Sequence, residues 1–164
     1  MRRIVVCDTG PLLHLGEANI INLLNLAGEI IIPSVVAEEF KRNTSDIKLP
    51  DWVTIKELEE PYRRKTLEWR KQIDEGEAAA IALAMQMQAK WLLTDDAIAR
   101  QFGESLGLEI HGSIGLLLWA VAVGHVKSEN EALNSVDALA GSSLWISDRV
   151  INQARKTIRT LYSA

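Results

Sequence analysis

The sequence is poor in the residues that build disulfide frameworks and zinc sites. Cys7 is the single cysteine among 164 residues, so no internal disulfide can form. It ends the apolar run that starts at Ile4, and we expect it to be a small buried hydrophobic residue. The three histidines have no metal-ligand spacing, and with one unpartnered cysteine they argue against zinc.

Long hydrophobic segments are also lacking. The longest apolar run, residues 114–123, is interrupted by Gly115 and falls short of the roughly 20 residues that cross a bilayer. It predicts a buried helix and no membrane partner. The N-terminus does not follow the charged, apolar and small-residue order of a signal peptide, because Asp8 interrupts its apolar stretch. We therefore expect a cytoplasmic protein.

Linker-like and low-complexity segments are missing, which argues against long disordered regions. With 48% hydrophobic residues, a chain of 164 residues can supply one core. We expect a single domain over residues 1–164, with a helical extension from about residue 128.

The charge balance does not suggest a broadly basic nucleic-acid-binding surface, because the formal net charge is −4. Basic residues nevertheless cluster within residues 63–71 and 149–159. These clusters are either solvated helix faces or phosphate-binding patches. If a metal neutralises several acids, the local charge becomes less negative.

Short β-rich runs alternate with longer segments of helical periodicity, which predicts an α/β fold with helices covering a parallel sheet. We expect a turn over residues 8–11, before the first helix. The expected strands are residues 3–7, 29–32, 91–94 and 108–110, with an edge strand at 52–56. Further helices are expected near residues 18–26, 33–40, 60–70, 74–85, 97–106, 113–123, 129–140 and 147–161.

Carboxylates follow two of the predicted buried strands at the point where each strand ends. Asp8 directly follows the first strand, and Asp95 and Asp96 directly follow the third. Glu39 lies about two helical turns after the second strand, and Glu77 lies in the first turn of the helix before the third. Ligands of an open parallel sheet bind beyond the carboxyl ends of its strands, so all of these acids can reach one edge.

Several carboxylates in a small volume repel one another unless a cation neutralises them. An all-oxygen ligand set suits the hard cations Mg²⁺ and Mn²⁺. Such a site can polarise a phosphodiester, activate a water molecule and stabilise the leaving oxygen. Thr9 and Thr94 each stand beside an acid, where a hydroxyl can orient a carboxylate or a water. The sequence therefore predicts a nuclease-type site with one or two metal ions.

Each acid also has a structural alternative. Asp8 could initiate a turn, and Asp95 or Asp96 could cap the helix that follows them. We expect one member of this pair to bind metal while its neighbour caps the helix or contacts a second ion.

The two glutamates have similar alternatives. Only one of Glu38 and Glu39 can face the site, and we favour Glu39 because the phenylalanine that follows it should point into the core. Glu77 could serve only the N-terminus of its helix, a role that Asp74 or Glu75 could also fill.

Other catalytic motifs are absent. Gly10 and Gly16 are not followed by the Lys-Ser/Thr pair of a Walker phosphate loop. Residues 111–115 come nearest to a Gly-x-Ser-x-Gly nucleophile elbow but lack the first glycine. We expect Ser113 to be a helix N-cap. Trp119 and Trp145 are expected in the core, with a dimer contact as the alternative.

Five short motifs follow one another along the chain, from Ile-Val-Val-Cys-Asp-Thr-Gly-Pro-Leu at the start to a Gly-x-x-Gly-x-Leu-x-x-Ala pattern at the end. They occupy residues 4–12, 32–40, 76–84, 92–100 and 112–120. In this order and spacing they resemble PIN-domain proteins, in particular the VapC-like prokaryotic subgroup of predicted nucleic-acid-binding proteins. The resemblance covers about the first three quarters of the chain.

The resemblance implies a PIN-like three-layer sandwich and Mg²⁺- or Mn²⁺-dependent cleavage of RNA. It also implies homodimers and, in many relatives, a toxin restrained by a cognate antitoxin protein. By motif, Asp8, Glu39 and Glu77 would be the first three acids, and Asp95 or Asp96 the fourth. The third acid is often aspartate, so Glu77 is a longer variant.

The leading hypothesis is thus a metal-dependent endoribonuclease in which Glu39 binds or orients the attacking water. Arg100 and the basic clusters are candidates for contacts with phosphate groups. The main alternative is a PIN-fold module that binds RNA or a protein without cleaving it. The acidic pI and the insertion at residues 52–71 favour that alternative, whereas the complete set of acids argues against it. The insertion and the long C-terminus also depart from minimal toxins, which argues against a toxin role more than against a nuclease fold. A phosphohydrolase acting on small phosphate esters is a third hypothesis.

Overall fold

A five-stranded parallel sheet forms the central layer of the computed structural model, which describes residues 2–163. The strands are β1 (Ile4–Cys7), β2 (Glu29–Pro33), β3 (Thr54–Lys56), β4 (Trp91–Leu93) and β5 (Ile110–His111). They lie in the order β3-β2-β1-β4-β5, and every neighbouring pair is parallel. Each predicted strand has a counterpart, and the predicted α/β architecture is confirmed.

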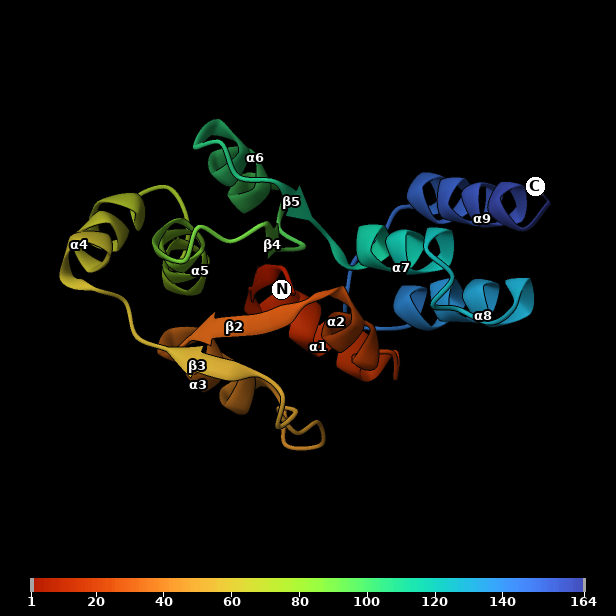
Figure 1. Cartoon of the computed structure of the whole chain (residues 1–164), viewed down its shortest axis with the longest axis horizontal. Coiled ribbons are helices and arrows are strands. Elements are labelled where there is room, and N and C mark those ends of the chain that lie inside the picture. The colour runs from red at the N-terminus through yellow and green to blue at the C-terminus, as the bar shows by residue number, and fades with distance from the viewer. Residues whose placement is uncertain (1, 164) are drawn as a thin grey trace.

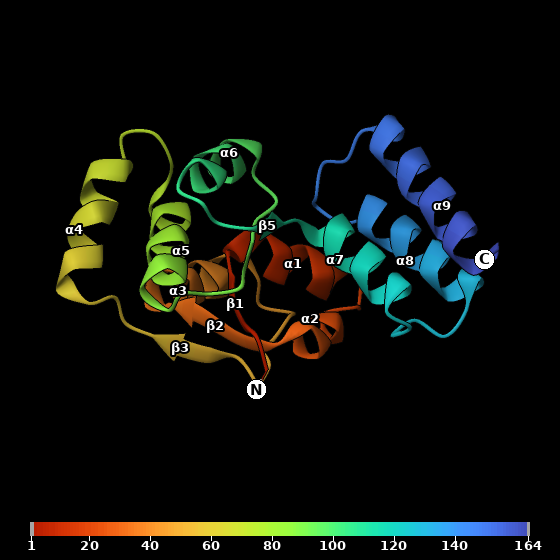
Figure 2. The same ribbon diagram turned by 45° about the horizontal axis from the view of Figure 1, so that its top comes forward.

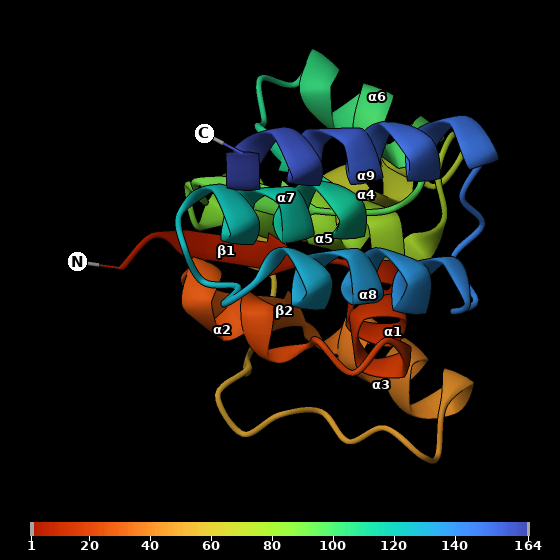
Figure 3. The ribbon, with the colours of Figure 1, turned by 90° about the vertical axis from the view of Figure 1, so that its right-hand side faces the viewer.

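Helices cover both faces of this sheet. Within the described residues they are α1 (Thr9–Glu17), α2 (Asn22–Ala27), α3 (Ser34–Asn43), α4 (Glu60–Trp69), α5 (Glu75–Gln86), α6 (Ala97–Ser105), α7 (Ser113–Ala122), α8 (Glu129–Ala140) and α9 (Asp148–Ser163). Figure 1 shows α4 and α5 on one side of the sheet and α7 to α9 on the other. The last three helices pack side by side (Figure 3). No helix among residues 2–163 is long and apolar enough to span a membrane.

The core extends from the strands of the sheet and α5 to the buried sides of α1, α2, α3 and α7 to α9. Val5, Val6 and Cys7 of β1 are fully buried, as expected for a central strand of a parallel sheet covered on both faces. α5 is rich in buried alanines, and it packs against β1, β2 and β4. Small side chains allow this helix to lie close to the sheet, which fixes the position of its first turn.

The expected turn over residues 8–11 is wrong, because α1 begins at Thr9. Asp8 is the N-cap residue, and its carboxylate accepts a hydrogen bond from the Thr9 N–H at 2.8 Å. Pro11 lies in the first turn, where the N–H that proline lacks has no partner within the helix. Asp8 and Pro11 therefore start a helix instead of a separate turn.

The sheet has a topological switch point between β1 and β4. The chain builds β1, β2 and β3 in one direction and then returns to add β4 on the other side of β1. Cys7 is in register with Leu93, so Asp8 and Thr94 leave the sheet at the same level. Figure 2 shows α1 following β1 toward α7, with α5 and α6 on the other side. Switch points of this kind are where open α/β sheets bind ligands.

The two tryptophans expected in the core differ. Trp119 packs edge-to-face against Trp91, with ring centroids 5.4 Å apart. Trp145 is instead 85% exposed, which corrects the expectation of a core residue. The reason is its position in the loop between α8 and α9, outside any amphipathic helix.

Candidate active site

Asp8 occupies the centre of the switch point and is only 6% exposed. Its Oδ1 accepts the Thr9 N–H at 2.8 Å, and its Oδ2 accepts the Thr94 hydroxyl at 3.0 Å. Burial raises the pKa of Asp8 to about 7; the two hydrogen bonds lower it, and the charges of Asp74 and Glu39 add to the increase. Asp8 therefore sits where a negative charge is costly unless a cation accompanies it.

Cys7 precedes Asp8 and is fully buried. Burial, followed by repulsion from Asp8 and Asp95, raises the pKa of the Cys7 thiol well above its ordinary value. The thiol stays protonated at neutral pH and packs as a small hydrophobic group.

Glu39 reaches the same cleft from α3. Its Oε2 accepts the Thr9 hydroxyl at 2.7 Å, whereas Glu38 is exposed. The Glu39 carboxylate lies directly over Gly76, at a point where a Cβ atom on residue 76 would be 2.3 Å from Oε2. Only glycine leaves room for the carboxylate in this position.

Glu77 both caps α5 and faces the other acids. It forms a capping box with Asp74, in which the Glu77 N–H donates to Asp74 Oδ1 at 2.8 Å and the Asp74 N–H donates to Glu77 Oε1 at 3.1 Å. Burial raises the pKa of Glu77 to about 7, and the charges of Asp74, Asp96 and Asp8 add to this effect. The capping role and the place among the acids are therefore compatible.

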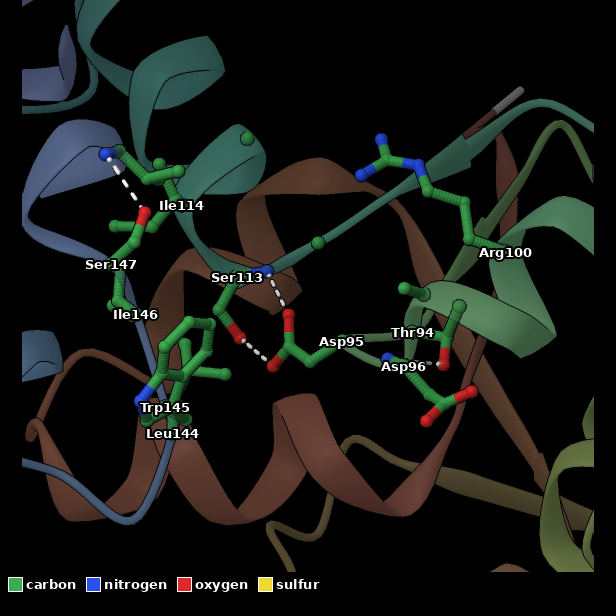
Figure 4. Close-up of a pocket in the computed structure, with 14 residues that line it drawn as sticks. Thr94, Asp95, Asp96, Arg100, Ser113, Ile114, Leu144, Trp145, Ile146 and Ser147 are labelled. Atoms are coloured by element: carbon green, nitrogen blue, oxygen red, sulfur yellow. Dashed lines mark hydrogen bonds between the residues drawn. The ribbon is translucent and has the colours of Figure 1, made fainter.

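Asp95 is held by protein groups on both of its oxygens. Ser113 donates its N–H to Oδ1 at 2.7 Å and its hydroxyl to Oδ2 at 2.6 Å (Figure 4). His14 Nδ1 lies 2.7 Å from the same Oδ2. The Asp95 side chain is only 8% exposed. Because His14 belongs to α1 and Ser113 begins α7, Asp95 links these two helices.

Asp96 is exposed and caps α6. Its Oδ2 accepts the Ala99 N–H at 2.8 Å, and its own N–H donates to the Thr94 hydroxyl at 3.3 Å. The charge of Asp96 helps to raise the pKa of Glu77. Asp96, rather than Asp95, thus acts on the neighbouring acid across the cleft.

These side chains line one cleft of about 430 Å³ at the carboxyl end of the sheet. Its acids are Asp8, Glu39, Asp74, Glu77, Asp95 and Asp96. As their side chains stand, no group of three or more His, Cys, Asp or Glu among residues 2–163 is arranged to hold a metal ion. The structure thus brings every predicted acid to one cleft but does not draw them to ligand distance.

The donor set fits a hard divalent cation in its chemistry. All donors are carboxylate oxygens, which suit Mg²⁺ or Mn²⁺. Burial raises the pKa values of Asp8 and Glu77 to about 7, and no cationic side chain among residues 2–163 forms an ion pair with either acid. Glu77 is half-buried and Asp96 is exposed, so neither carboxylate is enclosed by the core.

The predicted phosphate-binding residues lie outside the acid cleft. Arg100 is exposed, and its Nη2 donates to the Ile110 carbonyl at 3.0 Å. It lines an adjoining hollow of about 340 Å³ that shares Asp95, Asp96 and Trp145 with the acid cleft. The two basic clusters belong to α4 and α9, which lie at opposite ends of the molecule (Figure 1).

Three residues make contacts with the acids that were not predicted from the sequence. Ser113 is not an N-cap, because Gly112 holds that position without a side-chain bond and Ser113 binds Asp95 instead. His14, set aside as a zinc ligand, lies against Asp95, 81 residues away along the chain. Asp74 had a local signal, since an aspartate three residues before a glutamate is a capping-box pattern.

Comparison with known families gives one match. A family model described as a PIN domain matches residues 4–160. The match extends past the five motifs to most of α9, so the C-terminal helices fall within the family pattern. No curated protein matches the sequence at a significant level.

Proposed function

The chain belongs to the PIN-domain family, a nuclease-type fold, and from this membership we propose that it is a metal-dependent endoribonuclease. One observation carries the proposal. Asp8, Glu77 and Asp96 belong to three different segments and line one cleft at the topological switch point, and burial raises the pKa values of Asp8 and Glu77 to about 7. A cleft of this kind suits a divalent cation better than a neutral ligand.

We assign the residues as follows: Asp8, Glu77 and Asp96 hold Mg²⁺ or Mn²⁺, and Asp95 positions the cleft through Ser113 and His14. When bound, the metal supplies a Lewis acid that polarises a phosphodiester and makes a water molecule more acidic. The hydrogen bonds support these assignments, because Asp95 has three protein partners, two of them on Oδ2, whereas Glu77 and Asp96 each accept a hydrogen bond at one oxygen.

Glu39 is proposed to accept a proton from the attacking water or to orient it. The Thr9 hydroxyl fixes its Oε2 at 2.7 Å, and Gly76 leaves space for the carboxylate to stay there. Thr94, directly after β4, donates its hydroxyl to Asp8 Oδ2 in the same way. These neutral donors orient the carboxylates without adding a cation that would compete with the metal.

Cleavage of single-stranded RNA with Mn²⁺, and with a chelator instead, tests this proposal. Asp8→Asn and Glu39→Gln should each lower the cleavage rate by about 100-fold or more. Glu38→Gln is the matched control on the same helix and should cleave as the unmodified protein does, since Glu38 is exposed. Full Mn²⁺-dependent cleavage by Asp8→Asn would show that the assignment is wrong. RNA binding without cleavage by the unmodified protein would instead support a non-catalytic module.

The proposal also includes a toxin role, with a cognate antitoxin protein as partner, and a homodimer. Both rest on the family resemblance. Expression of the chain should slow the growth of the host cell, and Asp8→Asn should relieve that effect. Sedimentation of the purified protein gives its oligomeric state. Normal growth during expression of a protein that cleaves RNA in vitro would speak against the toxin role.

A further inference from the structure

Trp145 is the most exposed large hydrophobic residue of the described chain. Its side chain is 85% exposed, although an indole ring is among the largest apolar groups a protein can bury. An aromatic ring left open to solvent next to a cleft is a typical ligand-contact feature.

The loop that carries Trp145 is anchored on both sides. Ser143 donates its N–H at 3.2 Å and its hydroxyl at 2.6 Å to Oε1 of Glu17, at the end of α1. On the other side, Ile146 packs against the hydrophobic core. The ring is therefore presented from a loop that is tied to α1, the helix that starts at the metal-site acid Asp8.

Trp145 stands on the boundary between two hollows. It lines the acid cleft, and it also lines the adjoining hollow of about 340 Å³. In Figure 4 the indole and the Arg100 guanidinium lie on opposite sides of this second hollow, with Ser113 and Asp95 between them. A molecule that reaches from the acid cleft into the hollow passes the indole.

We propose that this second hollow binds a nucleobase of single-stranded RNA, stacked on Trp145, next to the phosphate that is cleaved. The inference rests on the proposed function and adds a base-binding subsite to it. The lining of the hollow is mainly apolar, as a base face requires, and Arg100 supplies the positive charge at its rim. Arg100 uses Nη2 for the Ile110 carbonyl, and its remaining N–H groups suit a neighbouring phosphate.

The charge of the whole chain favours a stacking contact. With a formal net charge of −4, the protein has no broad positive field to gather RNA. Stacking on an aromatic ring is short-ranged and accepts any base, because every base has a π-face. In a duplex both faces of a base are covered by its neighbours, so the subsite selects unpaired RNA.

Binding of a short fluorescently labelled single-stranded RNA tests the subsite, measured by anisotropy with Ca²⁺ in place of Mn²⁺. Trp145→Ala should weaken binding about tenfold, whereas Trp145→Phe should stay close to the unmodified protein because phenylalanine also stacks. Leu67→Ala is the matched control, since Leu67 is 61% exposed but lies on α4. Unfolding temperatures of all three variants check that the fold is intact.

Removal of one base identifies the contact. A series of RNAs carries one abasic position, placed at a different nucleotide in each RNA. One RNA of the series should bind the unmodified protein about tenfold more weakly than intact RNA does. The same RNA should bind Trp145→Ala with the affinity of intact RNA, because the contact is already lost. If the losses of RNA affinity caused by Trp145→Ala and by removal of a base were additive at every position, the proposal would be overturned. Equal affinity for the duplex would also overturn it, as would loss of a dimer by Trp145→Ala with no loss of RNA affinity, which would assign the ring to a second copy of the chain.

Cleavage kinetics separate this inference from the proposed function. Trp145→Ala should raise KM about tenfold and leave kcat within about twofold, because the ring contacts a base and none of the atoms of the bond that is cleaved. If Asp8→Asn abolishes cleavage while Trp145→Ala cleaves with an unchanged KM, only the subsite is wrong. If Asp8→Asn cleaves normally, the metal mechanism is wrong, and the abasic binding series still decides the subsite.

Discussion

Asp95 and Asp96 are sequence neighbours with different surroundings. Ser113 donates to both oxygens of Asp95, and His14 contacts Oδ2. The Asp95 side chain is almost fully buried. Asp96 is exposed, uses one oxygen to cap α6, and acts electrostatically on Glu77. Their exchange for asparagine therefore has different consequences.

Asp95→Asn should lower the stability of the protein. Its amide nitrogen cannot accept a hydrogen bond, so Ser113 or His14 loses a partner at a cost of about 1–3 kcal/mol. Asp96→Asn should keep its stability, since asparagine is an equally good N-cap, but should lose Mn²⁺-dependent cleavage by about 100-fold or more. Urea unfolding and RNA cleavage of both variants check this. A fully stable, inactive Asp95→Asn beside an active Asp96→Asn would reverse the assignment.

Gly76 tests whether the position of Glu39 matters. A Cβ atom there would lie 2.3 Å from Glu39 Oε2, so Gly76→Ala must displace that carboxylate. Cleavage should fall by up to about 100-fold, as misplaced catalytic groups cause. Helix propensity favours alanine by about 1 kcal/mol, so the fold should persist.

The control for this variant is Gly141→Ala at the C-terminus of α8, which lines neither hollow and where an added Cβ atom meets nothing closer than 3.5 Å. It should leave cleavage within about twofold, because no catalytic group has to move. Comparison of the two variants in the same cleavage assay separates displacement of Glu39 from a general effect of alanine in a helix. Equal activity of both variants would mean that the contact between Gly76 and Glu39 has no catalytic role.

At the level of elements, hydrophobic periodicity predicted most of the fold. β1, β2 and β4 are continuous apolar runs because the sheet is covered on both faces, and α5 to α9 lie within a few residues of their predicted bounds. The start of α1 was missed because Asp8, Gly10 and Pro11 also form a turn signal. The same local residues are compatible with a turn and with a helix N-terminus, and tertiary packing selects the helix.

The convergence of the acids in one cleft could be predicted from the ends of the strands. Asp8 and Asp96 follow strands, so parallel topology was enough to bring them together. The pairing of Asp95 with His14 and the contact between Glu39 and Gly76 join segments that are 81 and 37 residues apart, and no local pattern encodes them. Such contacts depend on how α1, α3 and α5 pack.

The N-terminus of α5 offers a test at this scale. Asp74→Ala removes the cap of the helix that positions Glu77, whereas Asp74→Ser removes the same charge but keeps a capping side chain. Asp74→Ala should therefore be about 1 kcal/mol less stable than Asp74→Ser and should cleave more slowly. Urea unfolding and cleavage rates of the two variants provide the measurement. Identical behaviour would show that the capping box does not hold Glu77.

At the level of the whole molecule, the acids concentrate at one end of the sheet and the basic clusters lie far from it, on α4 and α9. Several basic residues in those clusters already have acidic neighbours: Arg63 and Arg64 contact Glu60, and Arg155 contacts Asp137. Without a bound cation, the carboxylates of the acid cleft repel one another when they are ionised. Stability should therefore depend jointly on pH and on divalent cations.

The sign of the pH dependence follows from Asp8 and Glu77. Both have folded-state pKa values raised to about 7, from 3.8 and 4.5. The folded state therefore holds these protons more tightly than the unfolded chain, and stability falls as pH rises through the folded values. For buried Asp8 the effect approaches about 4 kcal/mol. The lowered pKa of Glu109 changes stability only below its ordinary value of 4.5, and therefore not between pH 5 and pH 8.

The metal-free protein should thus be more stable at about pH 5 than at about pH 8, and Mn²⁺ should stabilise it more at the higher pH, where the carboxylates are ionised. Urea unfolding at both pH values, with and without Mn²⁺, measures this. Asp8→Asn removes one of the two titrating acids, so it should reduce the pH dependence and the gain from Mn²⁺ together. Glu38→Gln, which changes an exposed acid, should alter neither. Greater metal-free stability at pH 8, or equal stabilisation by Mn²⁺ at both pH values, would contradict an acid cleft that needs a cation.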